Sequence, residues 1–457
     1  MLGTQSRRLN LSMPRVPASS AFRLIAAGVL AAASFAFAAQ PVSAPPLDFK
    51  PYHANGIYAP GERAGWTVTL APGMPSVPAA WNYTIRKNNS EVLQRGTLDL
   101  ASGTAVIEAT LNEPAMLYVE VTPATPSSDA NANPAEGTRP IHLGAAIAPW
   151  KLQPAASRPA DFDVFWDAKL QAQSAVPMNP VLTPTPTSVP GVEFYTVKLD
   201  ALGSHVQGYL AKPARAGKFP ALMMYQWAGV YALPPDNAAR RAAEGWLVFN
   251  VSSHDIPPTQ STGVPNDYAK IGNTSRETSY FLNMYLRDRR AIDYIASRPD
   301  WDGRTIVATG TSMGGHQSLA AAALDSRVTA VVVNEPSGAN TLGEVHGYQT
   351  GYPNWTSEDP RITTAAPYFD TVNFAPRIKA PLLLAVGFID TTCPPAGLWM
   401  VVNQVPAHKE VIVMIESDHN NLTPQKQGAW DARSKEVLDL LRTGAAFRPN
   451  EATVYGR

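Results

Sequence analysis

Short continuous apolar runs alternate with segments of helical spacing along the last two thirds of the chain. The runs cover residues 220–225, 246–251, 306–309, 328–333, 382–386 and 411–415. Continuous apolar runs are typical of parallel strands that are covered by helices on both faces. Residues 280–296 and 430–441 have the apolar spacing of helices, and residues 194–199 and 206–210 predict a leading pair of strands. We therefore predict an α/β domain with a mostly parallel sheet over residues 151–445.

Residues 45–150 follow a different pattern, in which apolar and polar positions alternate with a period of two. The apolar positions are Trp66, Val68, Leu70, Tyr83, Ile85, Leu98, Leu100, Ile107, Ala109, Leu111, Leu117, Val119 and Val121. A turn signal lies at residues 87–90, residues 123–140 are rich in loop-forming residues, and residues 141–147 predict a last strand. This pattern predicts a small antiparallel β-sandwich of the immunoglobulin-like type.

Residues 1–39 have the pattern of a cleavable signal peptide. Four arginines precede an apolar run at residues 24–38, and the run ends in Ala36-Phe37-Ala38, which is typical of a cleavage site. The run fits the apolar region of a signal better than a membrane span, and an uncleaved anchor is the alternative. Because Ser6-Arg7-Arg8 lies far from the run, the general export route is favoured over a twin-arginine route. We expect a periplasmic or secreted protein with no membrane contact after cleavage.

Composition narrows the classes of function. The chain has 457 residues, enough for two domains, and its 45% hydrophobic and 16% charged residues are typical of a globular protein. Lysine plus arginine and aspartate plus glutamate both number 37, so no net basic field exists to hold a nucleic acid. Cys393 is the only cysteine, so no internal disulfide can form. The sequence contains no metal, phosphate or dinucleotide motif, so no cofactor is expected.

The sequence Gly310-Thr311-Ser312-Met313-Gly314 joins the predicted strand at residues 306–309 to an alanine-rich helix predicted at residues 317–324. A strand, a tight turn and a helix form the context in which a Gly-x-Ser-x-Gly motif presents a nucleophilic serine. Glycine is needed on both sides because a side chain there would clash where the strand and the helix meet. The motif therefore predicts that Ser312 is the nucleophile of a serine hydrolase with the α/β-hydrolase fold.

A nucleophilic serine needs a base to take its proton and a carboxylate to orient that base. In α/β-hydrolases the acid and then the histidine follow the serine along the chain, each after a later strand. Asp390 follows the run at residues 382–386, and His419 follows the run at residues 411–415. Both positions are at carboxyl ends of strands, where the active sites of open α/β sheets lie. We therefore predict Asp390 as the acid and His419 as the base.

Other residues compete for these two roles. Asp418 is the alternative acid, but it adjoins His419 in sequence and is poorly placed to reach the far ring nitrogen. Asp370 is a third choice for the acid. Among the histidines, His316 would be carried away by the elbow helix, and His254 precedes the nucleophile in the chain.

Two backbone amides are expected to form the oxyanion hole, one from the residue after the nucleophile and one from the loop after an earlier strand. The first is the amide of Met313. The second is expected from Ala228, with Trp227 as the alternative, in the loop that follows residues 220–225.

Three aromatic residues are candidates for the lining of the substrate pocket. Trp227 and Tyr231 lie in the same loop as the predicted second amide, and packing on the sheet is the alternative role for both. Trp355 belongs to residues 337–367, a segment that is expected to cap the pocket.

With these residues in place, the α/β part resembles the acetyl xylan esterase and cephalosporin C deacetylase family of carbohydrate esterases. The resemblance covers residues 161–442 and rests on residues 161–166, 310–315, 368–375, 377–381 and 387–395. It implies that Asp390 and His419 correspond to the acid and the base of the family, and that acetyl esters on sugars are hydrolysed. The chain departs from the family pattern at residues 250–255, which lack an Arg-Gly-x-Gly stretch, and in its additional β domain.

The sequence thus predicts a serine carboxylesterase that removes acetyl groups from carbohydrates through an acyl-enzyme. A small-molecule or oligosaccharide acetyl ester is the expected partner, nucleic acid is not, and the oligomeric state is left open. A serine peptidase of the prolyl-oligopeptidase type is the alternative, because it shares the elbow and often carries an extra β domain. A non-catalytic carbohydrate-binding protein is a third hypothesis, which the order of Ser312, Asp390 and His419 disfavours.

Overall fold

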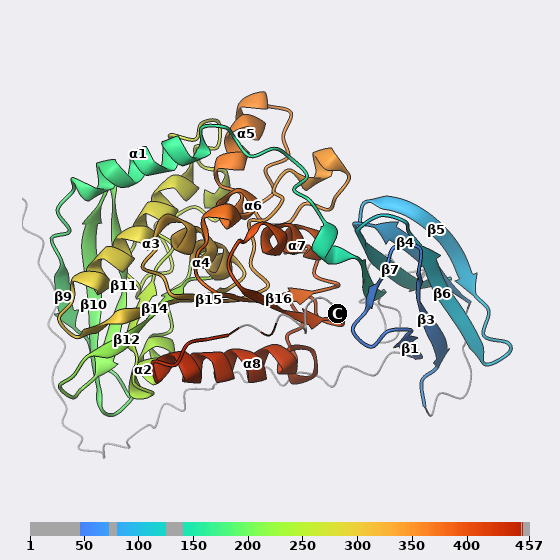
Figure 1. The fold of residues 1–457 in the computed structure, drawn as a ribbon, viewed down its shortest axis with the longest axis horizontal. Coiled ribbons are helices and arrows are strands. Elements are labelled where there is room, and N and C mark those ends of the chain that lie inside the picture. The colour runs from blue at the N-terminus through green and yellow to red at the C-terminus, as the bar shows by residue number, and fades with distance from the viewer. Residues whose placement is uncertain (1–45, 73–79, 125–139, 449, 451–457) are drawn as a thin grey trace, which may run out of the picture. The chain divides into compact units, whose positions relative to one another are not determined.

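The computed structural model describes residues 46–72, 80–124, 140–448 and 450 (Figure 1). The expected signal peptide lies outside the described residues, as does most of the loop expected at residues 123–140. Residues 44–457 belong to one unit by their contacts. The domain boundary expected near residue 150 therefore stays a prediction.

The first described strands form a β-sandwich of two sheets. The three-stranded sheet has the order β1-β3-β6, made of β1 (Leu47–Pro51), β3 (Arg63–Leu70) and β6 (Thr104–Thr110). The five-stranded sheet has the order β2-β8-β7-β4-β5, made of β2 (Ile57–Tyr58), β8 (Ile141–Ile147), β7 (Ala115–Pro123), β4 (Trp81–Lys87) and β5 (Glu91–Leu98). All strand pairs are antiparallel except β2 with β8.

The period of two in the sequence explains why these sheets pack face to face. Alternate residues of both sheets share one hydrophobic core, which includes Trp66, Val68, Ile85, Ile107 and Val119. The turn between β4 and β5 contains Asn88 and Asn89, both with positive φ, a conformation that asparagine tolerates better than most residues. The predicted β-sandwich is thus confirmed, with its hairpin turn at the expected place.

The other strands form a nine-stranded sheet with the order β17-β16-β15-β14-β12-β13-β11-β10-β9. The strands are β9 (Val181–Pro184), β10 (Val192–Ala201), β11 (Ser204–Pro213), β12 (Phe219–Tyr225), β13 (Leu247–Val251), β14 (Trp301–Thr311), β15 (Ala330–Asn334), β16 (Leu382–Gly387) and β17 (Lys409–Met414). The six strands from β12 to β17 run parallel, and β9, β10 and β11 extend one edge with antiparallel pairs. The predicted, mostly parallel sheet is confirmed.

The described α-helices are α1 (Phe162–Ser174), α2 (Pro235–Ala243), α3 (Tyr280–Ser297), α4 (Met313–Leu324), α5 (Pro360–Ala365), α6 (Thr371–Phe374), α7 (Pro395–Gln404) and α8 (Pro424–Arg442). Single 3₁₀ turns lie at Pro149–Lys151, Tyr268–Lys270, Gly343–His346, Ala366–Tyr368 and Ala375–Arg377. Helices α2 and α8 cover one face of the sheet, and α1, α3, α4 and α7 cover the other (Figure 1).

This double cover explains the continuous apolar runs. On β15, Val331 and Val333 enter the core under α4, while Ala330 and Val332 enter the core under α8. A strand that is buried on both faces has no polar positions left, so its sequence loses the period of two.

Strand β9 and helices α2 and α7 are among the elements that the sequence analysis did not predict. Strand β9 is a short edge strand, and α2 and α7 each begin with proline in the first helical position, where a missing amide hydrogen does no harm. Helix α4 begins at Met313, four residues before the expected start, because the elbow itself is the start of the helix.

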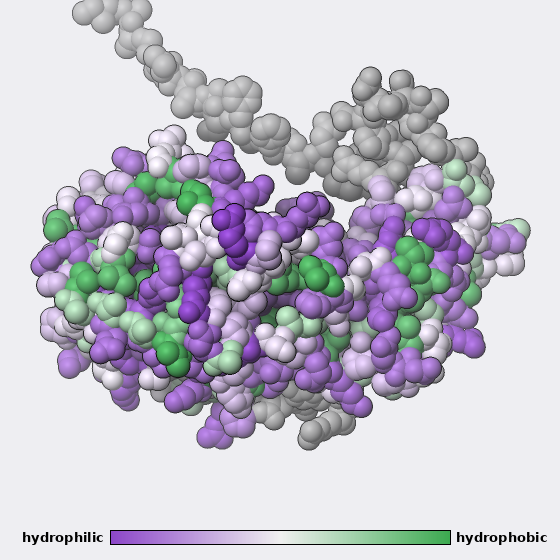
Figure 2. Space-filling model, turned by 90° about the horizontal axis from the view of Figure 1, so that it is seen from above, coloured by the Kyte–Doolittle hydropathy of each residue, from purple (hydrophilic) through white to green (hydrophobic). Residues whose placement is uncertain are grey.

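None of the helices in the described ranges is long and apolar enough to cross a membrane. On the face shown in Figure 2, hydrophobic residues form small patches among hydrophilic ones. Among the exposed hydrophobic side chains, Trp227 stands out because it is 54% exposed and lies in the loop expected to provide an oxyanion amide.

Candidate active site

Ser312 lies at the sharp turn between β14 and α4. Its φ of 55° and ψ of −124° form a backbone conformation that residues other than glycine rarely adopt. A Cβ on Gly310 would lie 2.3 Å from the carbonyl carbon of Gly314, and a Cβ on Gly314 would lie 2.3 Å from the carbonyl oxygen of Tyr225. Both glycines are therefore required by lack of space, as the sequence predicts. The strained turn presents the hydroxyl of Ser312 at the carboxyl ends of the strands.

His419 and Asp390 lie beside Ser312, each in a loop that follows a strand. His419 Nε2 lies 2.9 Å from Ser312 Oγ, and His419 Nδ1 lies 2.8 Å from Asp390 Oδ2. The carboxylate assigns the tautomer, because only an Nδ1–H can donate to it, and Nε2 is then free to accept the hydroxyl proton of Ser312. The structure thus brings the three predicted residues into one hydrogen-bonded line.

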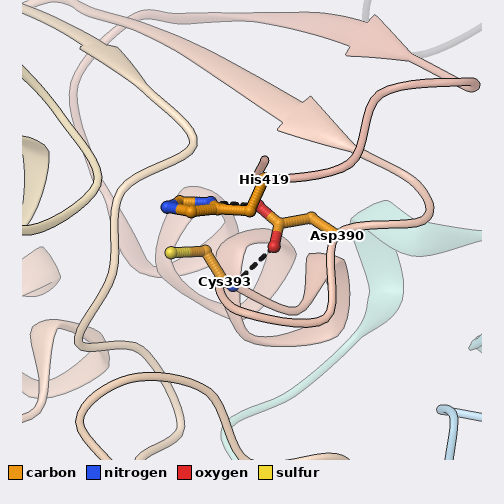
Figure 3. Close-up of side chains that lie close together, drawn as sticks. All are labelled: Asp390, Cys393 and His419. Carbon is orange, nitrogen blue, oxygen red and sulfur yellow. Dashed lines mark hydrogen bonds and ion pairs between the residues drawn. The ribbon is translucent and has the colours of Figure 1, made fainter. Parts of the chain in front are cut away.

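The loop after β16 fixes the carboxylate of Asp390 (Figure 3). Its Oδ1 accepts hydrogen bonds from the backbone amides of Thr392 at 2.8 Å and Cys393 at 2.7 Å. Its Oδ2 is left to accept from His419. Asp390 is only 1% exposed, so these donors replace water around both oxygens.

The surroundings raise the pKa values of two titratable groups of the site, the imidazole of His419 and the thiol of Cys393. Burial alone would lower the pKa of His419, but the hydrogen bond to Asp390 and the charge of its carboxylate raise that pKa above the usual value for histidine. Burial raises the pKa of the Cys393 thiol well above its usual value, and the nearby carboxylates of Asp390 and Glu335 add to this effect. The thiol therefore stays protonated and does not compete with Ser312 as a nucleophile.

Asp390, Cys393 and His419 also bring one donor atom each within 4.8 Å of one another, a set that could hold a metal ion (Figure 3). In the present arrangement, both oxygens of Asp390 and both ring nitrogens of His419 already have hydrogen-bond partners. These contacts are suited to the transfer of a proton from Ser312.

The competing acids have other partners. Asp418 pairs with Lys426 at 2.9 Å and accepts from Asn421. Asp370 caps α6 by accepting from the amide of Val372 at 2.9 Å, and it also binds Thr341. Neither carboxylate has a hydrogen bond to His419 in the described part of the chain, so Asp390 is the acid that the geometry selects.

The competing histidines have structural contacts. His316 is 1% exposed and contacts the hydroxyl of Tyr285, and burial lowers its pKa to about 4. His254 contacts the carbonyl oxygen of Gly229 through Nε2 at 3.1 Å and the hydroxyl of Tyr280 through Nδ1 at 2.8 Å. His254 thereby helps to hold the loop that follows β12.

That loop contains the predicted second amide of the oxyanion hole. The amide of Trp227 donates to the hydroxyl of Tyr231 at 3.0 Å, and the amide of Gly229 donates to the hydroxyl of Tyr268 at 3.0 Å. Between them, the amide of Ala228 has no hydrogen-bond partner among the described residues. The amide of Met313 is the first of α4 and has no partner within the helix. Ala228 and Met313 thus remain the candidates for the oxyanion hole.

A cavity of about 350 Å³ opens next to this loop, between α2 and α8. Its aromatic and polar lining includes Trp227, Tyr231, Trp430, Asn237 and Asn250. Thr311, directly before the nucleophile, also belongs to its wall. The two pocket candidates from the loop therefore lie at one cavity, whose wall includes Thr311 but none of Ser312, Asp390 and His419.

The structure corrects the expectation for Trp355. Its side chain is buried at 2% exposure, stacks on Phe369 with ring centroids 5.5 Å apart and contacts Phe281. Trp355 belongs to the hydrophobic core and is not among the residues that line the cavity.

Trp430 and Tyr268 are among the residues of the site that the sequence did not predict. Trp430 lies on the cavity side of α8, where the helical spacing gave it no distinction from other apolar residues. Tyr268 lies in a 3₁₀ turn without any sequence signal, and its hydroxyl contacts both the loop after β12 and the sulfur of Met313.

The nine-stranded sheet, the serine at the elbow and its histidine and aspartate partners define a serine hydrolase of the α/β-hydrolase class. Residues 150–433 match the acetyl xylan esterase (AXE1) family. The chain therefore belongs to the acetyl xylan esterase family, and the resemblance seen in the sequence is confirmed. A peptidase is not favoured.

Similar proteins agree with this membership. The chain is 30% identical over 390 residues to the acetyl esterase Axe7A of Xylanibacter ruminicola, which covers 81% of this chain and 85% of that protein. The solved acetyl xylan esterase from Paenibacillus sp. R4 has a TM-score of 0.56 at 24% identity and covers 63% of this chain and 98% of its own. Acetyl xylan esterase 1 from Thermoanaerobacterium sp. JW/SL YS485 has a TM-score of 0.54 at 22% identity. The match covers 64% of this chain and 97% of that esterase. The two solved structures share the fold of the α/β part.

Proposed function

We propose that this protein is a serine esterase that removes acetyl groups from oligosaccharides, with Ser312 as the nucleophile, His419 as the base and Asp390 as its orienting acid. The observation that carries the proposal is the hydrogen-bonded line from Ser312 Oγ through the imidazole to the Asp390 carboxylate. Membership of the acetyl xylan esterase family supports the acetyl ester as the bond that is cleaved.

In the acylation half-reaction, Ser312 Oγ attacks the carbonyl carbon of the acetyl group. His419 Nε2 takes the hydroxyl proton as the new C–O bond forms, and Asp390 stabilises the imidazolium through Nδ1–H. The amides of Met313 and Ala228 are proposed to donate to the oxygen that becomes negative. The imidazolium then protonates the departing sugar oxygen, which leaves an acetyl-Ser312 intermediate.

In the deacylation half-reaction, water takes the place of the sugar alcohol. His419 accepts a proton from the water as it attacks the acetyl carbonyl, and returns that proton to Ser312 Oγ when acetate leaves. The same three side chains thus serve both halves, which explains why the site needs no second base.

The cavity beside the site is proposed to bind a sugar unit of the substrate. Trp227, Tyr231 and Trp430 provide aromatic faces, and Asn237 and Asn250 provide groups that can both donate and accept hydrogen bonds. Apolar faces with a few polar groups are the usual composition of small-molecule sites. Acetylated xylo-oligosaccharides of increasing length test this part of the proposal, because only longer ones can fill the cavity while an acetyl group reaches Ser312.

Ser312→Ala provides the central test. The variant should release no acetate above the background from acetylated xylo-oligosaccharides or 4-nitrophenyl acetate, while its melting temperature and circular dichroism stay unchanged. A serine-directed phosphonate should label the unaltered protein at Ser312 and leave the variant unlabelled. Acetate release by Ser312→Ala at the rate of the unaltered protein would refute the assignment, and cleavage of aminoacyl amides but not of acetyl esters would favour a peptidase.

We also propose that the protein is exported to the periplasm or the medium. The support is the arginine-led apolar segment at residues 24–38 with its Ala36-Phe37-Ala38 ending. N-terminal sequencing of the protein from the cell exterior or periplasm should find a start shortly after Ala38. Full-length protein confined to the cytoplasm would contradict this proposal.

A further inference from the structure

Glu335 is a buried carboxyl residue at the same edge of the sheet, and the mechanism above does not use it. It directly follows β15, which lies between β14, the strand that leads to Ser312, and β16, the strand that leads to Asp390. Its residue exposure is 0%, and its φ of 42° lies in the left-handed region that few residues other than glycine adopt. Such strain persists only where the surrounding structure enforces it, and it is concentrated at functional sites.

The carboxyl group of Glu335 is wedged between the loops that carry the acid and the base. A Cβ on Gly387, three residues before Asp390, would lie 2.2 Å from Glu335 Oε1 and 2.7 Å from the carbonyl oxygen of Ser417. Ser417 is two residues before His419. The carboxyl group can occupy this place only because residue 387 has no side chain.

Gln427 of α8 contacts both Glu335 and Ser417. Its Nε2 donates to Ser417 Oγ at 2.7 Å and contacts Glu335 Oε2 at 3.5 Å. The backbone amide of Glu335 donates to the carbonyl of Ala385 on β16 at 3.2 Å. Glu335 therefore contacts the bases of both loops and the helix behind them.

The hydrogen bonding leaves one oxygen of this carboxyl group unsatisfied. Glu335 Oε1 has no donor among the described residues, although it is buried. Oε1 and the carbonyl oxygen of Ser417 both lie within 2.7 Å of the place that a Cβ of residue 387 would occupy, so this side of the carboxyl group faces an acceptor and no donor.

The surroundings of Glu335 shift its pKa in both directions, and the net result is a rise. Burial and the charge of Asp390 raise the pKa of Glu335 to about 7, while the hydrogen bond from Ser417, the charge of His419 and the hydrogen bond from Gln427 oppose the shift. The Cys393 thiol also feels the charge of Glu335, and the side chains that contact Glu335 from the His419 loop and α8, Ser417 and Gln427, carry no charge of their own. The charge of Glu335 in turn raises the pKa of His419.

We propose that Glu335 is a positioning residue, a second acid that braces the His419 loop against the Asp390 loop and adds its charge to that of Asp390 when the imidazolium forms. This inference rests on the esterase function proposed above. Glu335 acts through Ser417, Gln427 and the electric field, and it does not touch the substrate. A negative charge in a buried site stabilises the positive imidazolium of the transition state more strongly than it would in water.

Glu335→Gln tests the charge because it keeps the shape of the side chain. The expected kcat on 4-nitrophenyl acetate is about tenfold to a hundredfold lower at its plateau, as for other losses of positioning. The acidic limb of kcat/KM should move to lower pH, because loss of the negative charge lowers the pKa of His419. A purely structural role would lower kcat or stability without moving that limb.

Two controls make the test specific. Glu410→Gln removes another buried carboxylate, at the start of β17 and paired with Arg433, and should leave the acidic limb in place. Glu335→Asp keeps the charge, so it should retain the acidic limb of the unaltered protein even where kcat falls. An unchanged kcat and an unchanged limb in Glu335→Gln would overturn the inference.

The outcome can be separated from failure of the proposed function. If the unaltered protein neither releases acetate nor reacts with the phosphonate, the esterase assignment fails. If the unaltered protein releases acetate and reacts with the phosphonate, and Glu335→Gln has the same kcat and the same acidic limb, the esterase assignment stands and the role of Glu335 fails. Should Glu335→Gln not fold, an NMR titration of His419 in the unaltered protein should show two steps from coupling to a carboxyl group, and a single step would overturn the inference.

Discussion

Asn89 Nδ2 donates a hydrogen bond to Gln349 Oε1 at 2.6 Å, which joins the hairpin turn of the sandwich to the segment before α5. The backbone amide of Gln349 also donates to the backbone carbonyl of Asn88 at 2.9 Å. Gln349 Nε2 donates in turn to the carbonyl of Thr391 at 2.9 Å, and Thr391 follows Asp390. One glutamine side chain therefore links the sandwich to the loop that holds the proposed acid.

Loss of this link should reduce activity. Gln349→Ala is expected to lower kcat/KM several-fold and the free energy of unfolding by about 1–3 kcal/mol, because it removes both side-chain hydrogen bonds. Asn89→Ala removes only the bond to the sandwich, so its effect on kcat/KM should be smaller. Kinetics on 4-nitrophenyl acetate and urea unfolding measure the two effects. Equal kcat/KM values for Gln349→Ala and the unaltered protein would show that the link does not position the loop of Asp390.

The pH dependence of kcat/KM should report His419. The imidazole must be neutral to accept the proton of Ser312, and Asp390 raises the pKa of His419 above 6.5. Activity should therefore fall as the pH drops through a midpoint above 6.5. Asp390→Asn should move that midpoint to lower pH and reduce kcat by roughly 10⁴, the loss seen when such an acid becomes an amide. A midpoint that does not move in Asp390→Asn would mean that another carboxylate orients the imidazole.

Buried neutral histidines should make the fold sensitive to acid. Burial holds the pKa of His316 at about 4 in the folded protein, while the unfolded chain has the usual value of 6.5. Between these values the unfolded state binds more protons, so stability falls as the pH drops from 6.5 towards 4. The loss is about 1.4 kcal/mol for each pH unit in that window. Urea unfolding at several pH values should show a smaller loss for His316→Asn, and an equal loss would show that His316 does not contribute.

The sequence predicts those features that depend on order along the chain. The apolar runs identify the strands because both faces of each are covered, and the acid and base follow from their place after β16 and β17. Whether a buried side chain lines a cavity is not predicted in this way, since it depends on how distant segments pack. Trp355 and Trp430 have the same residue type, yet one is enclosed by Phe281 and Phe369 and the other lines the cavity.

The contacts of Glu335 show the same limit. Its neighbours Gly387, Ser417 and Gln427 are dispersed over 41 positions of sequence, and no local pattern brings them together. The positive φ of Glu335 has no signature in the residues around it. Only the assembled sheet reveals a second carboxyl between the two loops.

Two glycines with opposite surroundings test whether the elbow is limited by space. Gly314→Ala would place a Cβ 2.3 Å from the carbonyl oxygen of Tyr225, a backbone atom that cannot move without displacing β12. We expect a loss of several kcal/mol of stability and of nearly all esterase activity, because overpacking here also moves Ser312.

Gly428→Ala on α8 is the matched control, because a Cβ there meets nothing within 4 Å. It should raise the free energy of unfolding by about 0.5–1 kcal/mol and leave kcat unchanged, since alanine favours the helix. Urea unfolding and acetate release measure both variants, and a Gly314→Ala protein as stable and active as Gly428→Ala would disprove the steric explanation of the motif.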